Sequence, residues 1–184
     1  MFLLSQHMIN QVFDNFDRTE FSDEIYSIYG RALTVAARFD SNCKALARLP
    51  LFKASLIAKY ALNEEQYSEM VKKVNSKYKN LNRAIESLKF DDDLEVILSN
   101  AREARNELIH ETPLGSENGF DLHNTLVLNE HLTDIQNLVL TIIKGDALVS
   151  AILSTYNKEP ISNSPFSESY ENKYVNWVME REEI

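Results

Sequence analysis

The sequence predicts an all-α protein, an antiparallel bundle of four to five main helices with a short C-terminal extension. The 184 residues include only four glycines and four prolines, too few for a many-stranded protein, which needs a turn signal every ~8–12 residues. Apolar residues instead recur at three- and four-residue steps over long stretches, as they do on one face of a helix. The bundle is expected to occupy residues 1–155, and a linker with a terminal helix residues 156–184.

The first expected elements are a short apolar helix over about 3–17 and a long helix over about 22–48. Ser22 is a candidate N-cap, and Asp23 and Glu24 follow in the first turn, where negative charge suits the helix dipole. Pro50 is expected to end the long helix, because the residue before a proline is disfavoured in the helical conformation. Its single apolar stripe consists of Ile25, Ile28, Tyr29, Ala32, Ala36, Phe39, Cys43 and Leu46.

The remaining helices are bounded by capping and turn residues. Residues 51–62 predict a short buried helix, and residues 63–88 predict one Lys- and Asn-rich helix that opens with a capping box of Asn63 and Gln66. The acidic triplet 91–93 opens a helix to about His110, and a loop follows over about 112–128. Asn129 is expected to cap a last long apolar helix to about Ser154. A terminal helix within 167–184 docks either onto this chain or onto a partner.

Composition narrows the class of protein. Hydrophobic residues make up 44% of the chain and charged residues 26%, close to globular averages. The single cysteine, Cys43, permits neither an internal disulfide nor a Cys-built zinc site, and it fits a reducing cytoplasm. We find no signal-peptide pattern and no uninterrupted apolar run of about 18 residues. The expectation is a soluble cytoplasmic protein without membrane contact.

The overall charge is acidic. The formal net charge is −9 and the sequence pI is about 5.0. Broad, non-specific binding of nucleic acid requires a basic surface that displaces counterions, so this balance argues against it. The balance does not exclude a small basic site within an acidic body.

The end of the helix over 91–110 carries the most informative residues, in the sequence Arg-Asn-Glu-Leu-Ile-His at positions 105–110. At ~100° per residue, Arg105 falls on the apolar face of this helix. A guanidinium at a core-facing position is costly unless it is paired or faces a cleft. Arg102 and Asn106 lie on one flank of that face, and His110 lies further round the same flank. The apolar face consists of Leu94, Ile97, Leu98, Ala101 and Leu108.

Two interpretations follow from these residues. In the structural one, Arg105 pairs with an acid on the long helix, such as Glu24 or Asp40, and His110 caps the helix end, where its charge suits the dipole. In the functional one, Pro113 ends the helix and the chain bends to bring His110 beside Arg105. An arginine clamps phosphate oxygens and a histidine exchanges a proton near neutral pH, so this pair suits phosphodiester chemistry without a metal or other cofactor.

The stretch 105–110 resembles the Arg-polar-x-x-x-His motif of the HEPN superfamily, small all-α domains of bacterial defence and toxin–antitoxin systems. The resemblance implies a metal-independent endoribonuclease that acts on RNA as a homodimer, with two Arg/His sets facing one cleft and an antitoxin protein as partner. It assigns the scissile phosphate to Arg105, the 2′-hydroxyl or the leaving oxygen to His110, and a supporting role to Asn106. Arg102 is a natural second phosphate contact, and the expected product is a 2′,3′-cyclic phosphate.

The resemblance also implies a polar residue near the site on the long early helix, for which Glu24, Asp40, Ser41 and Asn42 are the candidates. An alternative is a non-catalytic HEPN-like regulatory or interaction module. A third interpretation is a helical bundle in which the motif is coincidental.

Other candidate groups give weaker signals. The histidines His7, His123 and His131 show no metal-ligand spacing with one another or with Cys43. Cys43 lies on the apolar stripe of the long helix, so a core thiol is the expected role. The chain has neither a Gly-rich phosphate loop nor a Gly-x-Ser-x-Gly elbow. Lysines at 72, 73, 77 and 79 are candidates for RNA contact, although charged residues on a helix surface are usually only solvated.

Overall fold

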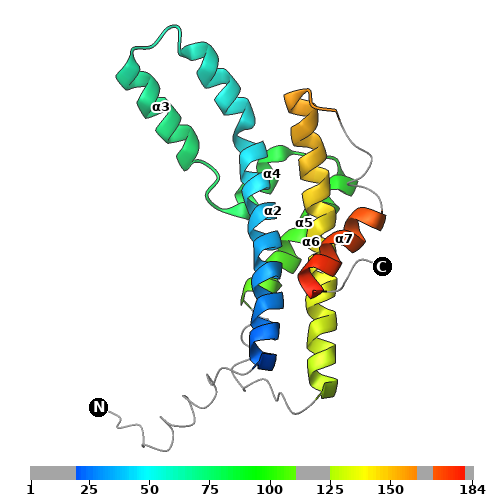
Figure 1. Cartoon of the computed structure of the whole chain (residues 1–184). Coiled ribbons are helices and arrows are strands. Elements are labelled where there is room, and N and C mark those ends of the chain that lie inside the picture. The colour runs from blue at the N-terminus through cyan, green and yellow to red at the C-terminus, as the bar shows by residue number, and fades with distance from the viewer. Residues whose placement is uncertain (1–19, 111–124, 161–167, 181–184) are drawn as a thin grey trace, which may run out of the picture.

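The computed structural model describes residues 20–110, 125–160 and 168–180, and this part of the chain is entirely helical apart from turns. The prediction of an all-α bundle is confirmed. The expected helix over 3–17 and most of the expected loop over 112–128 lie outside the described residues. The helices, shown in Figure 1, are α2 (Glu20–Ala58), α3 (Glu64–Ser76), α4 (Leu81–Leu88), α5 (Asp92–His110), α6 (Thr125–Asn157) and α7 (Glu168–Met179).

The core lies where α2, α5 and α6 pack against one another, with α4 and α7 closing its sides. The apolar stripe predicted on the long helix is the α2 contribution, and Phe39 and Cys43 at its centre are fully buried. Burial of this kind stabilises a fold by roughly 1.5–3 kcal/mol for each large apolar side chain. The largest fully buried residues of the other helices are Leu98, Leu108, Ile135, Val139, Ile142, Ile143, Val149 and Val178.

Gly145 sets the closest approach between the three main helices. A Cβ atom at this position would lie 2.5 Å from Ala101 Cβ on α5 and 3.0 Å from Cε2 of Phe39 on α2. Real Cβ atoms are essentially never found at the shorter of these separations, so only glycine fits without a shift of its neighbours. A small residue on α6 therefore allows α5 and α2 to pack against it at the same level.

Pro50 does not end the long helix, contrary to the sequence prediction, and α2 continues through it to Ala58. A proline inside a helix removes one backbone hydrogen bond and displaces the preceding turn, but good helix formers on both sides can continue the helix with a bend. In Figure 1 the upper part of α2 tilts away from the bundle. The predicted short buried helix over 51–62 is this continuation, and it is largely exposed: Leu56 is 58% exposed and Ile57 76%.

The single helix expected over 63–88 is two helices. The predicted capping box of Asn63 and Gln66 is present at the start of α3. The chain leaves the helical conformation at Lys77, which is extended, and Tyr78 follows with φ at +54°. The Asn80 side chain then caps α4 by accepting from the backbone N–H of Arg83. Carbonyl groups freed by this break are satisfied by Arg48, whose side chain donates to the backbone oxygens of Lys77 and Tyr78.

The last two helices differ from the prediction mainly in their bounds. Helix α6 begins at Thr125, four residues before the expected cap Asn129, and ends at Asn157. The terminal helix, α7, docks onto this chain, because Val175, Val178 and Met179 belong to the core. Within the described residues, 129–157 of α6 are long and apolar enough to cross a membrane, with a mean hydropathy of 1.7. Core helices of globular proteins meet the same criterion, and α6 packs against α2, α5 and α7.

The glycine contact yields a paired test of packing. Gly145→Ala is expected to lower the free energy of unfolding by about 1–3 kcal/mol, the usual effect of overpacking a core. Gly30→Ala places a methyl group where nothing lies within 4 Å, so the gain in helix propensity should raise stability by about 0.5–1 kcal/mol. Urea unfolding of both variants measures the difference, and a Gly145→Ala protein as stable as Gly30→Ala would contradict the close approach.

Candidate functional site

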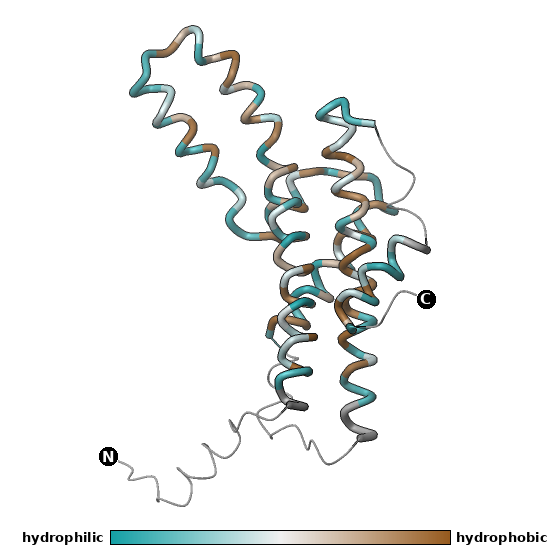
Figure 2. The backbone as a smooth tube through the Cα atoms, viewed as in Figure 1, coloured by the Kyte–Doolittle hydropathy of each residue, from teal (hydrophilic) through white to brown (hydrophobic). Residues whose placement is uncertain are grey.

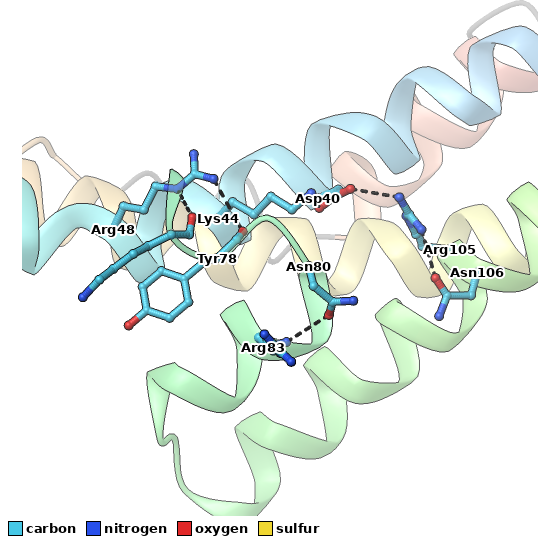
Figure 3. Close-up of polar contacts among 9 residues, drawn as sticks. Asp40, Lys44, Arg48, Tyr78, Asn80, Arg83, Arg105 and Asn106 are labelled. Atoms are coloured by element: carbon cyan, nitrogen blue, oxygen red, sulfur yellow. Dashed lines mark hydrogen bonds and ion pairs between the residues drawn. The ribbon is translucent and has the colours of Figure 1, made fainter. Parts of the chain in front are cut away.

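Arg105 joins α5 to α2 through an ion pair. Its Nη2 lies 2.9 Å from Oδ2 of Asp40, and its Nη1 donates to Oδ1 of Asn106 at 3.0 Å. The other carboxylate oxygen of Asp40 is 2.7 Å from Nζ of Lys44, one turn further along α2. The side chains of Arg105 and Asp40 are 21% and 14% exposed. The result is a partly buried group of two cations around one carboxylate, shown in Figure 3.

Among the candidates on the long helix, the structure brings Asp40 to Arg105. Asn42 instead donates to Asp146 on α6, and Ser41 and Glu24 are exposed. The guanidinium on the core-facing side of α5 is thus paired, as its cost of burial requires. This pairing is the one foreseen by the structural interpretation, and it also supplies the acidic neighbour that the HEPN resemblance implies.

His110 lies in the last turn of α5 and is exposed. The helix is unbroken from Arg105 to His110, so the bend expected to bring the two side chains together does not occur between them. Five residues correspond to about 500° of rotation and ~7.5 Å of rise, which leaves the two side chains ~140° apart around the axis. No described residue forms a hydrogen bond or ion pair with His110.

The other two predicted residues lie beside Arg105. Asn106 is exposed and holds one end of the Arg105 guanidinium. Arg102 is one turn earlier and interacts with its own helix, through Oε1 of Glu103 at 3.1 Å and Oγ of Ser99 at 3.4 Å. Its side chain is 25% exposed. Arg102, Arg105 and Asn106 therefore form one polar patch, and His110 stands apart from it.

Tyr29 fixes the end of α5 that carries the motif. Its hydroxyl on α2 donates to the backbone oxygen of Leu108 at 2.5 Å. The last four carbonyl groups of a helix have no intrahelical partner, so this bond satisfies one of them. Burial raises the pKa of Tyr29, which keeps its hydroxyl protonated as the donor. Two contacts from α2, by Tyr29 and by Asp40, thus hold the final turns of α5 in place.

A second polar cluster, which was not predicted from the sequence, surrounds Asp146 of α6. The Asp146 side chain is 5% exposed, and its carboxylate lies 3.1 Å from Nε of Arg38 and accepts from Nδ2 of Asn42 at 2.8 Å. Arg38 also donates to the hydroxyl of Tyr174 on α7. The cluster ties α2, α6 and α7 together. The available signal was a single acid in the apolar run from Ile142 to Val149.

The electrostatics of this cluster follow from burial. Loss of hydration raises the pKa of Asp146 above its ordinary value of 3.8, and the smaller effects of the Arg38 charge and the Asn42 hydrogen bond oppose the rise. The pKa of Arg38 is raised because the favourable charges of Asp146 and the two tyrosines of α7 together outweigh its own desolvation. The cluster therefore joins three helices, and burial disfavours the charged form of its carboxylate.

The remaining cysteine and histidine candidates give no further site in the described part of the chain. Cys43 is a fully buried free thiol whose pKa is raised by burial, as expected for a core residue. Burial lowers the pKa of His131, while His7 and His123 lie outside the described residues. Within the described ranges, no three His, Cys, Asp or Glu side chains are grouped to hold a metal ion. An open apolar groove between α5, α6 and α7 is lined by Leu94, Ile97 and Leu148, among others, and does not include Arg105 or His110.

No protein-family model, curated protein or solved structure matches the chain.

The ion pair predicts an asymmetric mutational response. Asp40→Asn removes the partner of both Arg105 and Lys44, and we expect it to lower the free energy of unfolding by about 1–3 kcal/mol. Arg105→Gln leaves Asp40 with Lys44 and should cost less. Urea unfolding of the single and double variants gives their coupling energy, expected at about 0.5–3 kcal/mol. Additive effects of the two substitutions would show that the pair is not formed.

Asp146 predicts a pH dependence of stability. Because the fold raises its pKa, the folded state holds this proton more tightly than the unfolded state. The stabilising contribution is therefore present below the unfolded pKa and lost as pH rises through the folded one. Asp146→Asn lacks this titration, so its free energy of unfolding should rise relative to wild type as the pH increases through the range above 3.8, the ordinary pKa of this acid. A constant difference across this range would contradict the prediction.

Proposed function

We propose that the protein is a metal-independent endoribonuclease of HEPN type, acting as a homodimer with Arg105 and His110 at a shared cleft. The single observation that carries the proposal is the sequence Arg-Asn-Glu-Leu-Ile-His at the end of α5, on a helical bundle whose long early helix supplies Asp40 to the arginine. Asp40 and Asn106 hold the guanidinium from two sides, which fixes its direction. A fixed guanidinium is the form in which arginine best recognises a phosphate.

The proposed reaction uses the 2′-hydroxyl of the RNA as its nucleophile. The 2′-oxygen forms a bond to phosphorus, and the bond from phosphorus to the 5′-oxygen of the next nucleotide breaks. One proton leaves the 2′-hydroxyl and one is delivered to the 5′-oxygen, and His110 is the group that exchanges a proton near neutral pH. Arg105 stabilises the charge that builds on the phosphate oxygens. The products are a 2′,3′-cyclic phosphate and a free 5′-hydroxyl.

A second copy of the chain is part of the proposal for a geometric reason. Arg105 and His110 point about 140° apart around α5, so one chain does not aim both side chains at one phosphate. In a symmetric pair the ends of the two α5 helices face each other, and the shared cleft receives side chains from both chains. As a defence or toxin-like enzyme, such a dimer would be held inactive by an antitoxin partner.

One observation favours an alternative, a non-catalytic module of the same class that regulates or binds a partner. The charge of Arg105 is already met by Asp40, and His110 stands away from it. In this alternative Arg105 is a structural tie between α2 and α5, and the exposed polar patch around Asn106 contacts a protein. The two functions differ in whether RNA is cut when the purified dimer is supplied with it.

The decisive experiment compares wild type with Arg105→Lys and His110→Ala, by cleavage of total RNA and by growth inhibition on expression. Arg105→Lys keeps the charge beside Asp40 but loses the planar fork, so we expect cleavage to fall by about 10²–10³-fold. His110→Ala should lower cleavage by about 10²–10⁴-fold, the usual contribution of a general acid or base.

Asn100→Ala, an exposed residue of the same helix, is the matched control and should cut RNA as wild type does. Wild type that neither cuts RNA nor slows growth would exclude the enzyme and favour the non-catalytic module. Activity that survives both site substitutions would place the reaction elsewhere on the molecule.

A further inference from the structure

The charges of the chain are strongly segregated along its sequence. Residues 44–89 hold ten of its nineteen Lys and Arg residues but only four of its twenty-eight Asp and Glu residues. The protein is acidic overall, with a net charge of −9, yet this quarter of the chain is basic. Non-specific attraction of a polyanion depends on the local charge of a surface more than on the net charge of the molecule.

The structure connects these basic residues to the site on α5. Arg105 forms an ion pair with Asp40, Asp40 forms a second one with Lys44, and one further turn of α2 leads to Arg48. Arg48 donates to the backbone oxygen of Lys77 at 2.8 Å, which places the end of α3 beside it. Asp40, Lys44 and Arg48 are spaced at four-residue steps, so they lie along one face of α2 at intervals of ~6 Å. Figure 3 shows this row of side chains.

The row continues onto α3 and the connection to α4. Lys73 lies in the last turn of α3, Lys77 directly follows this helix, and Lys72, Lys79 and Arg83 are close in sequence. All five of these side chains are exposed. We call the set that runs from Lys44 and Arg48 through these residues the basic track. Within the track the only neighbouring carboxylates in sequence are Asp40 at one end and Glu69 and Glu86 at its sides.

The track runs along the base of a projecting arm. The arm consists of helix α3 and the part of α2 that follows Pro50. Helix α3 packs mainly against α2. Figure 1 shows it standing away from the other helices, and Figure 2 shows hydrophilic residues interspersed along both of its helices. At its tip Tyr60 is 95% exposed. An exposed aromatic ring offers a face on which a nucleic-acid base can stack.

We propose that the basic track binds the phosphate backbone of single-stranded RNA and leads it from the arm to Arg105. This inference rests on the proposed ribonuclease function, because it takes RNA as the ligand. Lysine side chains on a helix surface contact phosphates as point charges without reading sequence. Binding is therefore sequence-independent and strongly weakened by salt. The acidic remainder of the chain repels RNA, which restricts binding to the track.

Binding is measured separately from cleavage by using a 2′-O-methyl RNA of about 20 nucleotides, which has no free 2′-hydroxyl and cannot be cut. Wild type should bind it in fluorescence anisotropy, with a log–log salt slope of about −2 to −3, as expected for three or four phosphate contacts at ~−0.7 each. Lys73→Gln/Lys77→Gln should weaken binding by about 10-fold at low salt and reduce the slope by about 1.4.

Lys144→Gln/Lys158→Gln is the matched control, because it removes the same charge from two exposed lysines of α6 and its end. It should bind as wild type does. Equal loss in both double variants, or no binding by wild type, would overturn the track. Full competition by polyglutamate at equal charge would also overturn it in favour of an acidic protein as the ligand.

The failure of the track and the failure of the enzyme are distinguishable. RNA that is bound through the track but never cut refutes the nuclease and leaves the track standing. RNA that is cut by wild type and by Lys73→Gln/Lys77→Gln at the same rate, with the same affinity, refutes the track and leaves the nuclease.

Discussion

The fold depends on one steric constraint, the absence of a side chain at Gly145. At that position α6 lies against Ala101 of α5 and the ring of Phe39 on α2. Both polar clusters lie next to this contact in sequence. Asp40 follows Phe39 and reaches Arg105, one turn beyond Ala101, while Asp146 follows Gly145 and reaches Arg38. A larger residue at 145 would separate the three helices and lengthen every one of these polar contacts at once, because the interior of a protein is close-packed.

The two clusters use charge in different ways. Asp146 is nearly inaccessible and is surrounded by donors from α2, with Tyr174 of α7 bound to the same arginine. This arrangement specifies which faces of α2, α6 and α7 meet, at a cost in hydration that appears as the raised pKa of the acid. The Asp40 cluster is more accessible and shares one carboxylate between Arg105 and Lys44. A carboxylate shared between two cations leaves one surplus positive charge in this cluster, whereas the charges of Asp146 and Arg38 balance each other.

The sequence predicted the helices from their apolar periodicity but placed several of their ends wrongly. The stripe through Phe39 and Cys43 is periodic enough to identify both the helix and its buried face. The prediction that Pro50 ends the long helix was wrong because a proline disfavours a helix locally, whereas the residues on both sides of it favour one. The break before Asn80 was missed because it depends on Arg48, thirty residues earlier, which satisfies the freed carbonyl groups. Contacts between distant residues leave no trace in local periodicity.

The candidate site was predictable to a similar extent. The helical projection identified Arg105 as a charge that needs a partner and named Asp40 as one of two acids able to supply it. It did not identify the Asp146 cluster, because the pairing of an acid on α6 with Arg38 on α2 is set by the packing of those helices. The sequence predicted that His110 lies at the end of α5, but not where its side chain points relative to Arg105. The direction of its side chain depends on whether α5 stays regular up to His110. The residue types near Pro113 do not determine that.

The burial of Cys43 allows the opening of the core to be measured through the reactivity of this thiol. The thiol is the only one in the chain, and it lies in the seam between α2 and the rest of the core, with a pKa raised by burial. A thiol in this position reacts with an alkylating or disulfide reagent only when the seam opens, because reaction requires both access and the thiolate form. The rate of labelling therefore counts opening events of the core directly. For the same reason the folded chain is protected from oxidation and from accidental cross-linking to its neighbours.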